Sequence, residues 1–201
     1  MSGYPREELE EMMRRWIEGN RKAEESGGKW SDHLGPFYRD DAVYRWGLGP
    51  NENFVARGRK QIEDWALGYQ MEGFEEWVYP YADVIIDDKQ GMVIAMWKQV
   101  APYKRDDGGE YIINGIGGSW FKYAGDFKWE SQEDFFDFGN AMALFMELAA
   151  DNKLSPKVKR KIQMLAKGKL LLGHEKVRPE RSLFEKLRGY TAMAKIALVG
   201  R

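Results

Sequence analysis

The sequence predicts an α+β fold in which helices pack on a curved antiparallel sheet and further helices follow. Residues 5–25 carry apolar side chains at the spacing of one helix face. Residues 77–137 change to four strand-like runs separated by turns, and helical patterning returns after residue 140. Helices and short strands followed by a four-strand meander are typical of the α+β class.

The N-terminal helix begins at Pro5, because proline suits the first turn of a helix. Its apolar stripe consists of Leu9, Met12, Met13, Trp16 and Ile17. Four short elements follow, in this order: a helix capped by Ser31, strands at residues 42–46 and 54–56, and a helix over residues 59–69.

The meander consists of strands at residues 77–86, 92–103, 111–123 and 128–137. The second strand is apolar on both faces, so both faces are expected to be covered. Gly115, Gly117 and Gly118 lie within the third strand, which favours a bend or the close approach of another group over a phosphate loop. The last helix is expected to open at Pro179.

Composition excludes several kinds of chemistry. The chain of 201 residues has no cysteine, which excludes a disulfide scaffold, a thiolate zinc site and a cysteine nucleophile. Its two histidines are too few for a His-rich metal site, so no metal is predicted. No apolar run reaches the roughly 18 residues that span a bilayer. The acidic N-terminal segment lacks a signal-peptide layout, so we expect a cytoplasmic protein without stable membrane insertion.

Charge divides the chain in two. Residues 155–201 hold 8 Lys and 5 Arg against 3 Glu, whereas residues 1–154 carry a net charge of about −11. We therefore expect an α+β domain over residues 1–150 and a basic helical extension over residues 151–201. Packing of the extension on its own domain or on a partner subunit is favoured over binding to a membrane surface or to nucleic acid, because the first domain is acidic.

Three segments, FYRDDAVY, ARGRKQIEDW and FKYAGDFKWESQEDFFD, give the chain a family resemblance. In this order of elements, residues 6–150 resemble the nuclear-transport-factor-2-like (NTF2-like) superfamily, in its SnoaL-like branch. The resemblance implies a cone-shaped sheet wrapped around the N-terminal helices, with a deep apolar pocket. It also implies a homodimer. Members include cyclases, isomerases, dehydratases, epoxide hydrolases, certain lyases and non-catalytic binders, so the site must be argued from its residues.

Two chemistries of the superfamily do not fit this sequence. The tyrosine, base and protonated acid of ketosteroid isomerases fall at Trp16, Trp46 and Ser119, which do not transfer protons in that way. Scytalone-type dehydratases use two pocket histidines, and this chain has none between Leu34 and Gly173. Both mechanisms are therefore rejected.

Limonene-type epoxide hydrolases are more similar locally. Tyr44 matches their water-holding tyrosine, and Asp134 matches the aspartate that acts as their base. Their Arg-x-Asp pair is absent, since Trp97-Lys98-Gln99 stands in that region, and Trp46 occupies the position of their asparagine. Because two of the five roles are matched, an epoxide hydrolase with a changed site stays an alternative.

Four residues are candidates for catalysis. Asp134 is the candidate general base, because an apolar pocket raises the pKa of a carboxylate towards neutrality. Tyr44 is the candidate hydrogen-bond donor, and Lys98 and Arg45 are candidate cations for a developing oxyanion. The residues expected to bind substrate are mostly aromatic: Trp16, His33, Tyr38, Trp46, Tyr69, Trp77, Trp97, Tyr103, Asn114 and Trp120.

These residues favour a cofactor-independent lyase acting on a bulky aromatic or polycyclic alcohol. A base, a phenol and a cation around such an alcohol would suit dehydration or retro-aldol cleavage. The sequence has no dinucleotide fingerprint or P-loop, which favours a reaction without a cofactor. The most specific version is a lignin-derived diarylpropane diol that loses formaldehyde, an activity found in the superfamily. The alternatives are a polyketide cyclase, an epoxide-hydrolase-like enzyme, a carrier of hydrophobic ligands and a dimeric adaptor that uses its basic tail.

Overall fold

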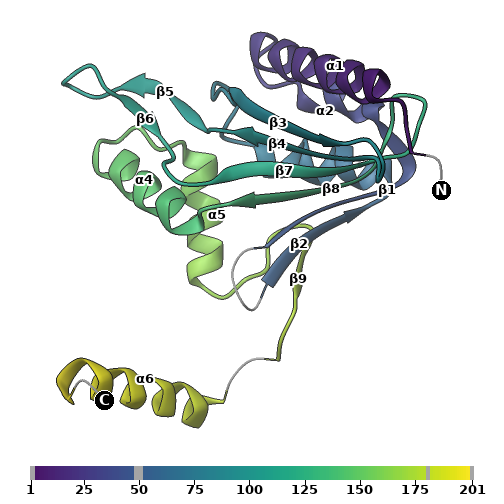
Figure 1. Cartoon of the computed structure of the whole chain (residues 1–201). Helices are drawn as coiled ribbons and strands as arrows, with labels where there is room; N and C mark the ends of the chain where they lie inside the picture. Colours follow the sequence, from purple (N-terminus) through teal and green to yellow (C-terminus); the bar gives the residue numbers. More distant parts are fainter. Residues whose placement is uncertain (1–2, 48–51, 180–181, 200–201) are drawn as a thin grey trace.

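The computed structural model describes residues 3–47, 52–179 and 182–199. The helices of the α+β fold (Figure 1) are α1 Arg6–Glu25, α2 Trp30–Leu34, η1 Gly35–Phe37, α3 Arg59–Gln61, η2 Ile62–Ala66, η3 Tyr69–Met71, α4 Phe138–Ala150, α5 Pro156–Ala166 and α6 Leu183–Val199. The strands are β1 Tyr38–Gly47, β2 Glu52–Arg57, β3 Tyr81–Asp87, β4 Met92–Trp97, β5 Val100–Lys104, β6 Glu110–Ile112, β7 Gly117–Tyr123, β8 Trp129–Phe136 and β9 His174–Lys176.

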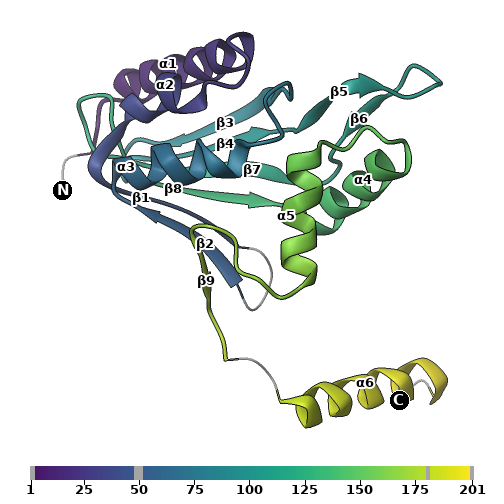
Figure 2. The ribbon, with the colours of Figure 1, turned by 180° about the vertical axis from the view of Figure 1, so that it is seen from behind.

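Seven strands form one curved sheet in the order β3-β4-β7-β8-β1-β2-β9, and β5 and β6 form a separate ribbon. The pairs within the sheet are antiparallel except β1 with β8, which run parallel. The predicted α+β class with a curved sheet is confirmed, with this one parallel pair added. Helices α1 and α2 and the segment from α3 to η2 lie on one face of the sheet (Figures 1 and 2).

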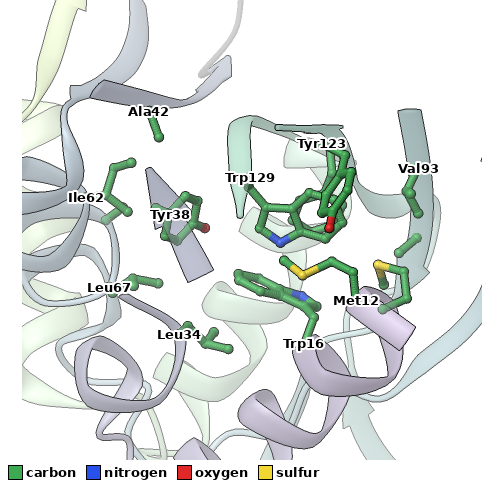
Figure 3. Packing of buried hydrophobic residues seen from close by; sticks show 14 of the residues in the cluster. Met12, Trp16, Leu34, Tyr38, Ala42, Ile62, Leu67, Val93, Tyr123 and Trp129 are labelled. Carbon is green, nitrogen blue, oxygen red and sulfur yellow. The ribbon is translucent and has the colours of Figure 1, made fainter. Parts of the chain in front are cut away.

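The main core lies between α1 and the sheet. Figure 3 shows Met12 and Trp16 of α1 facing Trp129 of β8, and all three side chains are buried. The Trp16 ring packs edge-on against Trp129 at a centroid distance of 6.2 Å and against Phe121 at 5.1 Å. The apolar stripe of the N-terminal helix therefore anchors α1 on the concave face of the sheet.

Two of the expected long strands are interrupted. The strand expected at residues 92–103 divides into β4 and β5, because β4 pairs with β7 whereas β5 pairs with β6. The strand expected at residues 111–123 divides into β6 and β7. Gly117 allows a close approach here, since a Cβ on it would lie 2.9 Å from the carbonyl oxygen of Trp97.

Other local expectations are corrected as well. Lys29 is the N-cap of α2, while Ser31 donates its hydroxyl to the carbonyl of Glu63 at 2.7 Å. The helix expected at residues 59–69 forms as the short pieces α3, η2 and η3, and η2 is a π-helical turn. The last helix begins at Leu183, not at Pro179, and β9 was not predicted.

The two C-terminal helices differ in their surroundings. Helix α5 lies with α4 beside one end of the sheet, and Val158 of α5 joins a second core cluster with Leu144 and Leu148 of α4. Helix α6 stands apart from the remainder in both views (Figures 1 and 2). Among the described residues, no helix has the length and apolar character needed to cross a bilayer.

Candidate active site

An apolar cavity of about 220 Å³ lies between the concave face of the sheet and the helices that cover it. Its walls come from α1, α2, the segment from η2 to η3, the central strands, α4 and α5. Aromatic side chains supply much of the wall: Trp16, Trp30, Tyr44, Trp46, Phe74, Tyr79, Tyr81, Trp97, Phe136, Phe138 and Phe145. Such a wall suits an aromatic ligand.

Strand register brings the polar residues of the cavity together. Asp134 of β8 lies opposite Ser119 of β7 and opposite Trp46 of β1. Two residues along the strands, Gln132 of β8 lies opposite Tyr44 of β1. Because directly opposed residues in a sheet project to the same face, these side chains all point into the cup.

Three donors surround the carboxylate of Asp134. The Ser119 hydroxyl donates to Oδ1 at 2.6 Å, and Nε2 of Gln132 donates to the same oxygen at 2.7 Å. The Tyr44 hydroxyl donates to Oδ2. Asp134 itself lines the cavity, so its carboxylate is both held by the protein and open to a ligand.

The environment of Asp134 shifts its acidity and that of its neighbour. Burial raises the pKa of Asp134 above its ordinary value, although the hydrogen bonds from Gln132, Ser119 and Tyr44 offset part of this rise. Burial first, and then the charge of Asp134, raise the pKa of Tyr44 well above its ordinary value. Tyr44 therefore stays protonated as a donor, while Asp134 exchanges a proton more readily near neutral pH than an exposed aspartate does.

A second layer of hydrogen bonds orients the first. The Tyr38 hydroxyl donates to Oε1 of Gln132, which turns Nε2 of that amide towards Asp134. The indole Nε1 of Trp97 donates to the Ser119 hydroxyl at 2.8 Å, which leaves the hydroxyl proton for Asp134. The Ser119 and Gln132 donors are thus held in place before a ligand arrives.

Another phenol faces the cavity from strand β3. The Tyr81 oxygen accepts a hydrogen bond from Nε1 of Trp16 at 2.8 Å, so its own proton is available to another acceptor. Burial raises the pKa of Tyr81, with the charge of Asp134 adding to the effect. Tyr81 is a second protonated donor in the cavity that the sequence analysis did not single out.

Helix α5 supplies a buried lysine to the cavity wall. Nζ of Lys161 donates to the carbonyls of Gln70 and Glu72, each at 3.0 Å, and to that of Tyr69. Burial lowers the pKa of Lys161 to about 8, so the ammonium persists at neutral pH. Three carbonyls engage its three protons, so Lys161 holds this turn and does not serve as a free cation for substrate.

Five of the predicted site residues line the cavity together: Asp134, Tyr44, Trp16, Trp46 and Trp97. Three others lie next to it. Tyr38 is buried behind Gln132, Trp77 is buried in the second core cluster, and Tyr69 lines a neighbouring acidic cleft.

The two predicted cations lie outside the cavity. Arg45 points to the other face of β1, where Nε lies 3.8 Å from Oε2 of Glu133. Lys98 follows the end of β4, and its Nζ donates to the carbonyl of Gly115 at 2.5 Å. Strand alternation explains Arg45, since it lies between the inward-facing Tyr44 and Trp46.

The remaining predicted binding residues are also placed outside the cavity lining. Trp120 is 48% exposed because it alternates with the inward-facing Ser119 and Phe121. Tyr103 and Asn114 lie on exposed parts of the chain after it has left the main sheet, and His33 lies on the short helix α2 away from the cavity wall.

The sequence analysis did not include Ser119 and Gln132 in the site. Strand alternation could have indicated them, since Gln132 is two residues from Asp134 on β8 and Ser119 lies opposite Asp134 on β7. Asn20, Tyr81 and the contributions of α4 and α5 depend on packing between distant segments, and no local pattern signals them. Within the described residues, no group of three or more His, Asp or Glu side chains is arranged to hold a metal ion. The chemistry present in the cavity is that of one carboxyl group with phenolic, hydroxyl and amide donors.

Comparisons with known proteins show the fold. A candidate SnoaL-like polyketide cyclase from Shewanella denitrificans superposes with a TM-score of 0.51 at 13% identity, over 69% of this chain and 97% of that one. An NTF2-like protein from Anabaena variabilis has a TM-score of 0.50 at 14% identity, over 68% of this chain and 95% of that one. The chain has the NTF2-like fold. The resemblance to the NTF2-like superfamily is thereby confirmed at the level of the fold.

No family model matches the sequence, and no curated protein matches it significantly. About a third of this chain has no counterpart in either NTF2-like structure. At this identity the likeness concerns the fold alone, so the activity has to be argued from the cavity.

Proposed function

We propose that the protein is a cofactor-independent lyase that cleaves an aryl alcohol in the aromatic cavity, with Asp134 as the group that transfers the proton. The observation that carries this proposal is the Asp134–Tyr44 hydrogen bond inside an apolar, aromatic wall. There, burial raises the pKa of Asp134 towards the range in which a carboxyl both donates and accepts a proton.

The size of the cavity supports a ligand of one or two rings. A dry cavity of about 150 Å³ in another protein holds benzene, and this one measures about 220 Å³. The cavity is only partly enclosed, so part of a longer ligand can extend outward. A two-ring diaryl alcohol suits this space better than a four-ring polyketide.

The sharpest form of the proposal is a 1,2-diarylpropane-1,3-diol with a para-hydroxyl on the first ring. Protonated Asp134 gives its proton to the benzylic hydroxyl, which leaves as water. The phenol releases its proton to solvent, and its oxygen becomes the carbonyl of a quinone methide. The carboxylate then takes the proton of the terminal hydroxymethyl group. The bond to that carbon breaks, formaldehyde leaves, and the electron pair forms the stilbene double bond while the quinone methide returns to a phenolate, which regains a proton.

In this scheme Tyr81 donates a hydrogen bond to an oxygen of the substrate, and Tyr44 holds the carboxyl group of Asp134. The cations expected from the sequence take no part, because Arg45 and Lys98 lie outside the cavity. A polyketide cyclase is the second candidate, since the ring closure it catalyses needs a base and hydrogen-bond donors without a cation.

The test uses 1-(4-hydroxyphenyl)-2-phenylpropane-1,3-diol, with stilbene absorbance and released formaldehyde as readouts. Asp134→Asn is expected to lower turnover by about 10²- to 10⁴-fold while the dissociation constant changes little. Glu133→Gln is the matched control, because Glu133 is on the same strand but faces outward. Binding without turnover in the unaltered protein would favour a carrier, and turnover unaffected by Asp134→Asn would refute the assignment of the base.

The proposed enzyme is a homodimer. The outer face of the sheet exposes Ile85 and Trp120, at 61% and 48%, which suits burial against a second copy. Light scattering of the unaltered protein and of Trp120→Glu tests this, since a dimer through this face is expected to dissociate in the variant.

A further inference from the structure

We propose that Gln70 presents its side-chain carbonyl oxygen to the cavity as a built acceptor for a hydroxyl of the ligand, and that residues after 154 hold it in that orientation. The inference concerns the same cavity as the proposed function and rests on it only in that an aryl alcohol is taken as the occupant. Gln70 lines the cavity from η3.

The orientation of the Gln70 amide follows from a backbone carbonyl. One terminal atom of Gln70 lies 3.1 Å from the carbonyl oxygen of Leu172. A carbonyl only accepts, so this atom is the amide nitrogen Nε2, and the opposite assignment would bring two acceptors together. The same nitrogen lies 3.1 Å from Nε2 of His174 and has one proton left for it.

This contact in turn determines the tautomer of His174. Its Nε2 accepts from Gln70, so the ring proton of the neutral imidazole is on Nδ1. Nδ1 lies 2.6 Å from Oε1 of Glu52, which accepts that proton's hydrogen bond. The His174 ring also packs edge-on against both Trp46 and Phe54, at centroid distances of 5.0 and 5.7 Å, so it has little room to turn.

The titratable groups that face the His174 ring favour the neutral form on balance. Burial lowers its pKa most, and Lys161 of α5 lowers it further, whereas Glu52 of β2 raises it in part. A neutral ring is the state that accepts a hydrogen bond from Gln70. The orientation of the amide and the protonation of the ring are therefore consistent with each other.

The backbone of the same turn is held independently. Lys161 donates to the carbonyl of Gln70 at 3.0 Å, and also to those of Tyr69 and Glu72. Both the main chain and the side chain of Gln70 are thus fixed by residues from α5 and from the segment around β9. Lys161 and His174 act as positioning residues, since they reach the ligand only through Gln70.

What remains free on Gln70 is the oxygen Oε1. Both amide protons are engaged, and no hydrogen bond from any described residue reaches this oxygen. It therefore prefers a ligand with a hydroxyl donor at this position to one with a methyl ether. Trp46 links the two polar places, because it lies opposite Asp134 in the sheet and packs against His174. The substrate class this implies is an aryl alcohol with a second hydroxyl.

The first test needs no ligand. Nitrogen-15 NMR of the unaltered protein is expected to show His174 as the tautomer protonated on Nδ1, with Nε2 unprotonated. The chain has only two histidines, so His33→Gln assigns the two rings. A ring protonated on Nε2 would mean that Gln70 turns its oxygen to His174, and this would overturn the proposal.

The second test measures binding of two probes, 4,4′-dihydroxybiphenyl and 4-hydroxy-4′-methoxybiphenyl. The unaltered protein is expected to bind the dihydroxy probe about 3- to 10-fold more tightly, which is the range for one neutral hydrogen bond. Gln70→Met is expected to remove this preference. Gln99→Met is the matched control, because Gln99 also lines the cavity but has no such amide clamp among the described contacts.

The outcomes separate this inference from the proposed function. A preference that survives in Gln70→Met, or that Gln99→Met removes equally, would refute the role of Gln70. If Gln70→Met does not fold, Gln70→Glu replaces it: its carboxylate is expected to draw a proton onto Nε2 of His174, which NMR detects. Because these readouts are binding and imidazole protonation, absent turnover would refute the lyase and leave the inference standing.

Discussion

The two polar places in the cavity are built by different means. Around Asp134, neighbouring strands supply the donors, and the register of β7, β8 and β1 sets their positions. Around Gln70, the contacts join residues more than 100 positions apart, to Leu172 and His174. Sheet register tolerates perturbation of a distant helix, whereas the Gln70 clamp depends on α5 and on the segment after it. We therefore expect the two places to respond separately to mutation.

The largest effect is expected for a test of the two parts of the C-terminal region. Helices α4 and α5 pack in a buried cluster, whereas α6 stands apart from it. Leu148→Ala removes a fully buried side chain from the second core cluster and is expected to lower the free energy of unfolding by about 2–5 kcal/mol. The matched change Leu187→Ala is in α6, where the side chain is 54% exposed, and should cost less than about 0.5 kcal/mol. Urea denaturation measures the unfolding free energy of both variants. Equal losses in the two variants would contradict the difference between the buried cluster and α6.

Lys161→Met is expected to have the next largest effect, because it removes the donor from three carbonyls of the turn around Gln70. We expect a loss of about 1–3 kcal/mol in unfolding free energy. Lys157→Met in the same helix is the control, since its ion pair with Glu75 is exposed and contributes at most about 1 kcal/mol. If Lys161→Met keeps its turnover but loses the preference for the dihydroxy probe, the surroundings of Asp134 and of Gln70 respond independently.

The sequence predicts the sheet side of the cavity better than the extension side, and the reason is physical. Asp134 and Tyr44 lie on strands whose alternation can be read locally, so their inward direction follows from the pattern. Arg45 and Trp120 were misplaced because the same alternation turns them outward. Gln70, Lys161 and His174 meet only through tertiary packing, and no periodicity in the sequence carries that information.

The interruptions of the predicted strands have the same origin. Residues 92–103 read as one apolar run, yet after Trp97 the chain changes its partner on one side, from β7 to the ribbon strand β6, while Val100 still pairs with Val78. Hydrophobicity alone does not reveal a change of partner. The overall α+β class is more robust, because it depends on the order of elements and not on where each one ends.

Tyr44→Phe tests the sheet side with a smaller effect. It removes one of the donors that lower the pKa of Asp134, so that pKa is expected to rise further. The pH at which Asp134 is half protonated then increases. Since the proposed reaction starts from protonated Asp134, the fall of the rate with rising pH should move to higher pH. The loss at neutral pH is expected to be about tenfold, which corresponds to roughly one charged hydrogen bond. An unshifted pH–rate profile would exclude Asp134 as the titrating acid.

The smallest expected effect is a pH dependence of stability from the extension side. The pKa of His174 is lower in the folded protein than its ordinary value of 6.5, so the unfolded chain binds a proton first as the pH falls. Stability is therefore expected to decrease as the pH falls through 6.5 and below. His174→Gln should reduce this slope between about pH 5.5 and 7.5.

Asp134 contributes with the opposite sign, since its folded pKa is raised and protonation at low pH favours the folded state. Comparing the variant with the unaltered protein cancels that contribution, because Asp134 is present in both. A slope that does not change in His174→Gln would mean that the ring is not held neutral by its surroundings. The contacts of His174 would then not fix the orientation of the Gln70 amide, and the C-terminal segment would not build a second polar place in the cavity.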